Sequence, residues 1–332
     1  MKRIISLALS LGFILAGLIS CSKATAPKAG SAKAADMLSL LPVDSQGAVV
    51  VDVHRIMQIE SVKKSIAENE NKAKYDEFVQ MTGIDPEQDI FFFVGAMTGP
   101  IEQKHQDGAG LVNLKYDRDK VLALVQKEGG QLSQDEYNGL TIYQTAAGED
   151  KKPMSFVFLD ESNILLGTAA AVRKVIDVNQ KKADNIWKNE DMAPLLKGMN
   201  SAAMLWAGFA VPPEMMKEAS SQNPMLGAFS DIRSVILAFD YSHGNLLAEI
   251  TAMSPDPEKN KQMGDALNGF KVLGAGAAAQ EPLFGELLNK IEISSTAAQV
   301  KIAANLPEEL IKSLGEKMKP KKPETEPEEP DN

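Results

Sequence analysis

The sequence predicts an α+β protein made of two similar, mostly antiparallel sheet units with helices packed on them. Short strand-like runs alternate with longer segments whose apolar residues recur three and four positions apart, the spacing of an amphipathic helix. Several strand-like runs form pairs joined by a polar turn, which is typical of antiparallel hairpins. Since 44% of the residues are hydrophobic and only 6% are aromatic, we expect a large and mostly aliphatic core.

In the first half of the chain, two helices are expected among six strands. The strands are expected at residues 48–53, 90–94, 109–115, 140–144, 155–159 and 164–166. A helix is expected at 117–128, because Val121, Leu124 and Val125 lie on one apolar stripe, and a second helix at 169–178.

The second half follows the same order. Strands are expected at 202–207, 234–240, 245–252, 290–294 and 299–303, and helices at 257–267 and 307–314. The polar turn Tyr241–Asn245 joins the second and third of these strands into a hairpin.

The common order suggests a tandem duplication, with one unit at 36–184 and the other at 185–318. The most similar segments are 158–168 and 291–302, where two strands joined by a polar turn lead into a helix. The alternative is that two unrelated α+β segments align loosely in this way.

The N-terminus predicts a secretory signal peptide at residues 1–20. Lys2 and Arg3 precede an uncharged apolar stretch at 4–19, which is shorter than the roughly 20 residues needed to span a bilayer. The sequence Leu18-Ile19-Ser20-Cys21 closely resembles the lipobox of bacterial lipoproteins. The resemblance implies cleavage before Cys21, diacylation of its sulfur and a further fatty acyl chain, such as palmitate, on the new N-terminus.

The same resemblance implies a location in the cell envelope. Ser22, and not aspartate, follows the acylated cysteine, and by enterobacterial sorting rules this implies the outer membrane, with the protein facing the periplasm. Residues 21–35 are expected to form a lipidated flexible tether, and the Pro/Glu-rich residues 319–332 a disordered tail. Because Cys21 is the only cysteine, its acylation leaves no thiol for a disulfide, a redox centre or a thiolate nucleophile.

The charge of the chain excludes one class of partner. With 35 Lys+Arg against 45 Asp+Glu, the formal net charge is −10, so nucleic acid is excluded as a partner. Anionic lipid headgroups would also repel this surface, and attachment to the membrane is therefore expected through the N-terminal lipid.

Three further segments together resemble uncharacterised periplasmic and surface lipoproteins of Gram-negative bacteria. They are the lead-in Leu40–Ser45, the valine-rich strand that ends at Asp52-Val53, and the late segment Leu306–Leu310. The resemblance implies a secreted α+β module of unknown function, and it carries no functional residues to this chain.

No catalytic residue, metal site or cofactor is predicted. His54, His105 and His243 have no ligand partner at metal-binding spacing, and His243 lies in a hairpin turn. The acidic pairs Asp256/Glu258 and Glu308/Glu309 stand at helix starts, where negative charge is stabilising.

Two other segments are interpreted structurally. The run at 85–89 lacks the alternation and central glycine of a calcium loop and is expected to be a loop before a strand. The small-residue run at 274–279 lacks the residues of a phosphate-binding loop and is expected to be a mobile loop or a close-packed crossover.

One stretch suggests a hydrophobic ligand or partner site, because it gathers aromatic and methionine side chains around proline breaks. The candidate residues are Trp206, Phe209, Met215, Met216, Met225 and Phe229. The alternative is that the methionines form the buried face of a short helix.

The predicted function is that of a non-catalytic, membrane-anchored binding or scaffold module for another envelope component. The alternative is a periplasmic carrier of a lipid or other hydrophobic ligand. A hydrolase would require a cleft with convergent carboxylates or a Ser/His pair, which the sequence does not display.

Overall fold

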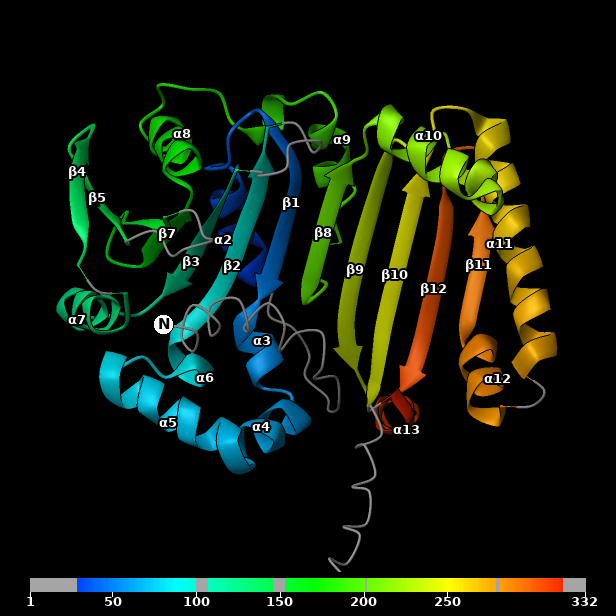
Figure 1. Ribbon diagram of the computed structural model, residues 1–332, viewed down its shortest axis with the longest axis horizontal. Coiled ribbons are helices and arrows are strands. Elements are labelled where there is room, and N and C mark those ends of the chain that lie inside the picture. The colour runs from blue at the N-terminus through cyan, green and yellow to red at the C-terminus, as the bar shows by residue number, and fades with distance from the viewer. Residues whose placement is uncertain are drawn as a thin grey trace, which may run out of the picture.

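The strands of the described chain lie in one antiparallel sheet of twelve strands, with helices on both of its faces (Figure 1). The computed structural model describes residues 29–99, 107–129, 131–145, 153–200, 202–278 and 281–318. The predicted α+β class is therefore confirmed. The predicted signal peptide, Cys21, His105 and the tail at 319–332 lie outside the described residues.

The strands are β1 (Ser45–Asp52), β2 (Ile90–Thr98), β3 (Asp107–Leu114), β4 (Ser133–Tyr137), β5 (Leu140–Gln144), β6 (Ser155–Phe158), β7 (Asn163–Gly167), β8 (Leu205–Ala210), β9 (Ser234–Ser242), β10 (Asn245–Met253), β11 (Ile291–Ser295) and β12 (Val300–Pro307). The α-helices are α2 (Ala29–Leu38), α3 (Val53–Met57), α4 (Glu60–Ala67), α5 (Asn69–Thr82), α6 (Pro86–Asp89), α7 (Arg118–Gly129), α8 (Ala169–Asn179), α9 (Met192–Lys197), α10 (Pro213–Gln222), α11 (Pro257–Ala278), α12 (Pro282–Asn289) and α13 (Glu308–Met318). Two short 3₁₀ helices are η1 (Ile186–Lys188) and η2 (Pro224–Phe229).

The two predicted sheet units are the halves of a single sheet and not two separate sheets. The strand order is β11-β12-β10-β9-β8-β1-β2-β3-β7-β6-β5-β4, and the halves meet where β1 pairs with β8, with Val49 opposite Ala207. We call this β1–β8 pairing the seam. The first strand of each half leaves one edge free, and these two edges pair with each other.

The halves share one connectivity outward from the seam. From the seam outward, the first half runs β1, β2, β3, β7 and β6, and the second half runs β8, β9, β10, β12 and β11. In both halves the first three strands are followed by the last strand of the half and then by the strand that precedes it in sequence. The hairpin β4–β5 of the first half has no counterpart in the second. A duplication would produce this order, and the duplication itself stays a prediction.

Alternate residues of each strand point to opposite faces of the sheet. On one face, which we call the α2 face, α2, α8 and α9 cover the middle of the sheet, and Val94, Leu111 and Leu165 are 0% exposed. On the other face, which we call the α11 face, helices α3 to α6 cover a second core cluster. A third cluster of Ile232, Met263 and Val300 lies under the start of α11.

Several segments differ from the sequence-based expectation. Helix α2 begins at Ala29 inside the predicted tether, because the alanines favour a helix and Ala34 packs into the core. The run at 274–279 was expected to be a mobile loop or a close-packed crossover, yet α11 continues through Ala278. The loop expected at 85–89 contains α6, which is capped by Asp85.

The residues between β1 and β2 form helices α3 to α6, which the strand-and-turn analysis did not anticipate. Among the helices of the described ranges, none is both long and apolar enough to cross a membrane.

Candidate binding surface

The outer strands of the second half, β10, β12 and β11, have one apolar face and one more polar face. In β10, Ala248 and Ile250 point to the α11 face. Glu249 lies between them and points to the α2 face, where its Oε1 is 2.9 Å from Nζ of Lys301 on β12. A half-covered antiparallel sheet normally turns its polar side to water and its apolar side to a core. The α11 face of these strands should therefore be buried.

The α11 face of these strands and of the neighbouring β9 is not buried, although it carries apolar residues from all four. We call the following set the open face: Leu237, Phe239, Ala248, Ile250, Ile291, Ile293, Ile302 and Ala304. Ile250 stands in the middle of β10 and is 38% exposed, and the other seven are partly exposed. The equivalent mid-strand residues on the α2 face, such as Leu111 and Leu165, are 0% exposed.

The open face also stands apart from the packed interior. None of its residues is among those that form or pack against the three core clusters of the described chain. Each strand belongs to the continuous sheet, so backbone pairing and not side-chain packing holds these residues in place. The result is a fixed apolar surface that contributes little to the core.

Helices stand around the border of the open face and leave its middle uncovered. Figure 1 shows α10 across one end of β9 and β10, α11 along the outer strand β11, and α12 and α13 at the opposite end. Exposed apolar side chains lie on three of these helices and on η2, which contacts α10 and α11: Met215 on α10 is 47% exposed, Met225 on η2 is 62%, Val272 and Leu273 on α11 are 72% and 71%, and Phe284 on α12 is 45%.

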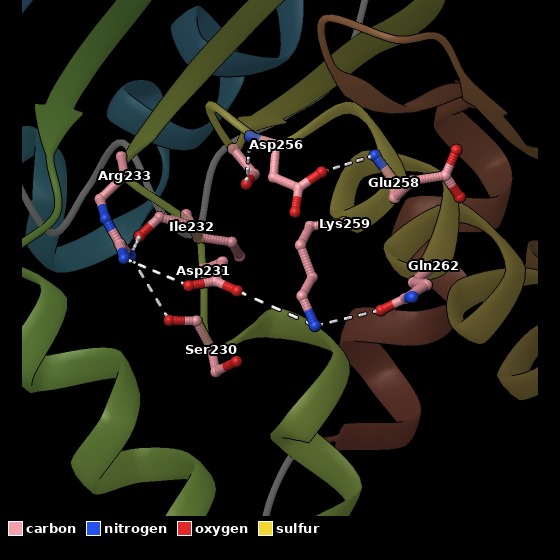
Figure 2. Close-up of polar contacts among 9 residues, drawn as sticks. Ser230, Asp231, Ile232, Arg233, Asp256, Glu258, Lys259 and Gln262 are labelled. Atoms are coloured by element: carbon pink, nitrogen blue, oxygen red, sulfur yellow. Dashed lines mark hydrogen bonds and ion pairs between the residues drawn. The ribbon is translucent and has the colours of Figure 1, made fainter.

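A polar network fixes the start of α11 to the start of β9 (Figure 2). The carboxylate of Asp231 accepts from Arg233 at 3.2 Å and lies 3.9 Å from Nζ of Lys259 in the first turn of α11. Asp256 accepts from the backbone N–H of Glu258 at 2.9 Å, which caps the helix. The border of the open face is therefore held by ion pairs at this corner.

Asn260 makes a second attachment at the same corner. It is 0% exposed, and its side chain accepts from the N–H of Ser254 and donates to the carbonyls of Ser254 and Ala297, all at 2.9 Å. This amide joins the end of β10, the first turn of α11 and the β11–β12 turn. Helix α11 is consequently attached to the sheet at the edge of the open face.

The opposite end of the open face lies near the seam. Tyr241 is on the same face of β9 as Phe239, is 3% exposed, and its hydroxyl has no hydrogen-bond partner among the described residues. Burial, together with the nearby Glu309 carboxylate, raises the pKa of Tyr241, so this group remains neutral. Arg55 of α3 pairs with Asp240 of β9 at 2.8 Å, which links the first half to the second.

The structure separates the six residues that the sequence grouped as a candidate site. Trp206 is 1% exposed and belongs to the core of the α2 face, where its ring lies against Gly208. Phe209 points to the α11 face. A Cβ at Gly47 would lie only 2.6 Å from its ring.

The other four lie on the bordering elements. Met216 and Phe229 pack against the third core cluster, and the ring of Phe229 stacks on Phe270 of α11 at a centroid distance of 6.4 Å. Met215 and Met225 are exposed. The stretch therefore contributes to both the core and the border, and not to one continuous patch.

The two histidines of the described chain lie in a turn and in a helix. His243 lies in the β9–β10 turn with φ of 53°, and its Nδ1 is 2.6 Å from Oγ of Ser242. His54 lies in α3, and no hydrogen bond to its buried Nδ1 is found in the described chain. In that same part of the chain, no group of three or more His, Cys, Asp or Glu side chains is placed to hold a metal ion.

The sequence does contain a signal for the open face. Apolar residues alternate with polar ones along β10, and this alternation predicts one buried and one exposed side. It gives no information on whether a helix covers the apolar side, which depends on the positions of α10 to α13.

The geometry defines an α+β protein with one large antiparallel sheet and an uncovered apolar face bordered by helices. The chain belongs to the family described as protein of unknown function (DUF3352), which matches residues 4–275.

Crystal structures of the Treponema protein TP0453 are similar to this chain in backbone path. Crystal form IV has a TM-score of 0.47 at 9% identity and covers 87% of this chain and 100% of that chain. Crystal form III has a TM-score of 0.47 at 10% identity and covers 85% and 98%. Similarity of this extent carries no functional residue to the present chain. No curated protein matches it.

Proposed function

We propose that this protein is a non-catalytic binding module of the cell envelope and that the open face is its contact surface. The observation that carries the proposal is the exposure of Ile250 in the middle of a fully paired strand, surrounded by seven other partly exposed apolar residues. Apolar surface gains about 25 cal/mol per Å² when it leaves water. An extended apolar patch on a rigid sheet is therefore typical of an interaction site.

The location of this module is proposed from its N-terminus. The lipobox-like sequence that ends at Cys21 supports an acyl anchor, and Ser22 after the cysteine supports the outer membrane, with the protein facing the periplasm. More than one acyl chain gives stable anchoring, whereas a single chain is marginal. We expect Cys21→Ala to move the protein out of the membrane fraction, and its retention there would contradict the anchor.

The contact surface is tested by site-specific photocrosslinking in the native envelope. A photoreactive amino acid is placed at Ile250 on the open face or, as a matched control, at Leu247 on the same strand. The two residues are 38% and 37% exposed but point to opposite faces of the sheet. They therefore differ in face and not in accessibility.

We expect a crosslinked adduct at position 250 and little or none at 247. Its partner, whether a protein or a lipid, is identified from its mass. Equal adducts at both positions, or none at 250, would contradict the assignment of the open face as the contact surface.

A further inference from the structure

We propose that the open face binds the hydrocarbon chains of a lipid, so that the bound component is an amphipathic small molecule and not a second protein. This inference rests on the proposed function, because it names the occupant of the same surface. Three properties of the surface support it: its chemistry, its dimensions and its border.

The chemistry of the open face matches hydrocarbon. All eight of its side chains are aliphatic or phenyl groups, so they offer neither a charge nor a hydrogen bond. A protein–protein interface typically has about one hydrogen bond per 100–200 Å² and a polar rim. An acyl chain needs no hydrogen bond and no countercharge, and it is complementary to a surface that provides neither.

The dimensions also match. The face extends across four neighbouring strands, from β9 through β10 and β12 to β11, and three strand spacings of about 4.8 Å give a width of about 14 Å. The hydrocarbon core of a bilayer is about 30 Å thick, so the chains of one leaflet extend about 15 Å. A lipid chain laid across the strands would therefore match the width of the face.

The border disfavours a second copy of the chain. Helices α10, α11 and α12 stand around the uncovered strands on the α11 face, and α13 lies beyond one end of the strands (Figure 1). Because a helix with its side chains is about 10 Å across, two open faces brought together would meet first at these helices. A thin, flexible occupant reaches the sheet without this obstruction.

The exposed apolar side chains of the border favour contact with a membrane, from which a lipid would reach the open face. Met215, Met225 and Phe284 lie on α10, η2 and α12 and are at least 45% exposed. Methionine side chains are flexible and polarisable, and they adapt to apolar surfaces of different shape. Together with Val272 and Leu273 of α11, which are 72% and 71% exposed, they add apolar surface on the border outside the open face.

The experiment uses the full chain with Cys21→Ala, incubated with vesicles of phosphatidylethanolamine and phosphatidylglycerol and then separated from them. Native mass spectrometry measures the fraction of protein that carries a lipid mass. The variant Ile250→Glu places a charge on the open face, and Leu247→Glu on the α2 face is the matched control because the two positions are equally exposed.

We expect lipid on the parent protein and on Leu247→Glu, and at least a tenfold lower occupancy on Ile250→Glu. A second variant, Ala248→Phe, introduces no charge and fills the same surface, and it should also lower occupancy if Ile250→Glu folds poorly. A parent protein without lipid, a lipid-free dimer, or equal occupancy in Ile250→Glu and Leu247→Glu would overturn the inference.

The crosslinked adduct at position 250 separates this inference from the proposed function. A lipid mass supports both. A protein mass overturns the lipid assignment and leaves the contact surface intact, and the absence of any adduct overturns the contact surface itself.

Discussion

Replacing Ile250 with alanine should cost much less stability than an equivalent change on the opposite face of the same sheet. Ile→Ala removes three carbon groups, worth about 2.4 kcal/mol at about 0.8 kcal/mol each when fully buried. Because 38% of Ile250 already contacts water, the expected loss falls to about 1.5 kcal/mol, and no closed cavity forms. Leu165 is 0% exposed within the core of the α2 face, so Leu165→Ala adds a cavity cost and should lose about 3–4 kcal/mol.

Urea denaturation of the two variants, both in the Cys21→Ala background, measures this difference of about 2 kcal/mol. Lipid should be removed first, because an occupant of the open face would stabilise the folded state. If Ile250→Ala destabilises the lipid-free protein as much as Leu165→Ala does, the open face is covered and the reasoning for a binding surface fails.

Three further substitutions test the framework of the sheet and its attached helices. Asn260→Ala should lose about 2–3 kcal/mol of unfolding free energy, since it leaves buried backbone groups unpaired, and a loss below 1 kcal/mol would contradict that role. Gly167→Ala places a Cβ 2.3 Å from the carbonyl oxygen of Gly108, so β3 and β7 must separate at a cost of about 2–3 kcal/mol, visible as a lowered Tm. Burial raises the pKa of the Asp52 carboxyl above 3.8, so the folded state binds the proton more tightly than the unfolded state. The stability of the wild type relative to Asp52→Asn should therefore rise as the pH falls from 7 toward 4 in urea titrations, and a constant difference would refute the raised pKa.

The sequence predicted correctly those elements whose pattern depends only on residues close to one another in the chain. The hairpin around His243 was found because a polar turn lies between two apolar strands, and the residue has the positive φ of such a turn. The helix at 169–178 was found because Val172, Val175 and Ile176 fall on one face, and all three are 0% exposed.

Elements that depend on tertiary contacts were missed or misjudged. Helices α3, α4 and α6 have only five, eight and four residues, so a helical period is hard to distinguish in them, and they are stabilised by packing at the end of the sheet, as with Val62, which is 2% exposed. The glycines at 274 and 276 suggested a loop, but the helix continues there, where α11 packs against α12.

The candidate site shows the same limit. Trp206 was included in the candidate site because aromatic residues are rare in this chain. Aromatic residues are common in protein cores, however, and Trp206 points to the covered α2 face of its strand. Ile250 is one of many isoleucines in alternating strands, and only the placement of the surrounding helices distinguishes it. The composition of the sequence therefore identified residues on the border of the open face. The residues at its centre, such as Ile250, could be identified only from the three-dimensional arrangement of the helices.

The seam has a consequence for how this protein is assembled. β1 is made early and β8 late, so the two strands that join the halves are separated by more than 150 residues, and contacts this distant in sequence form slowly. Until the second half is available, β1 is an unpaired edge with a row of valines, a template that any β8 strand can join. Two chains folding side by side could each supply β8 to the other, giving an exchanged dimer with the same local contacts. A high local concentration of newly made chains therefore favours the exchanged dimer until β8 has paired with its own β1.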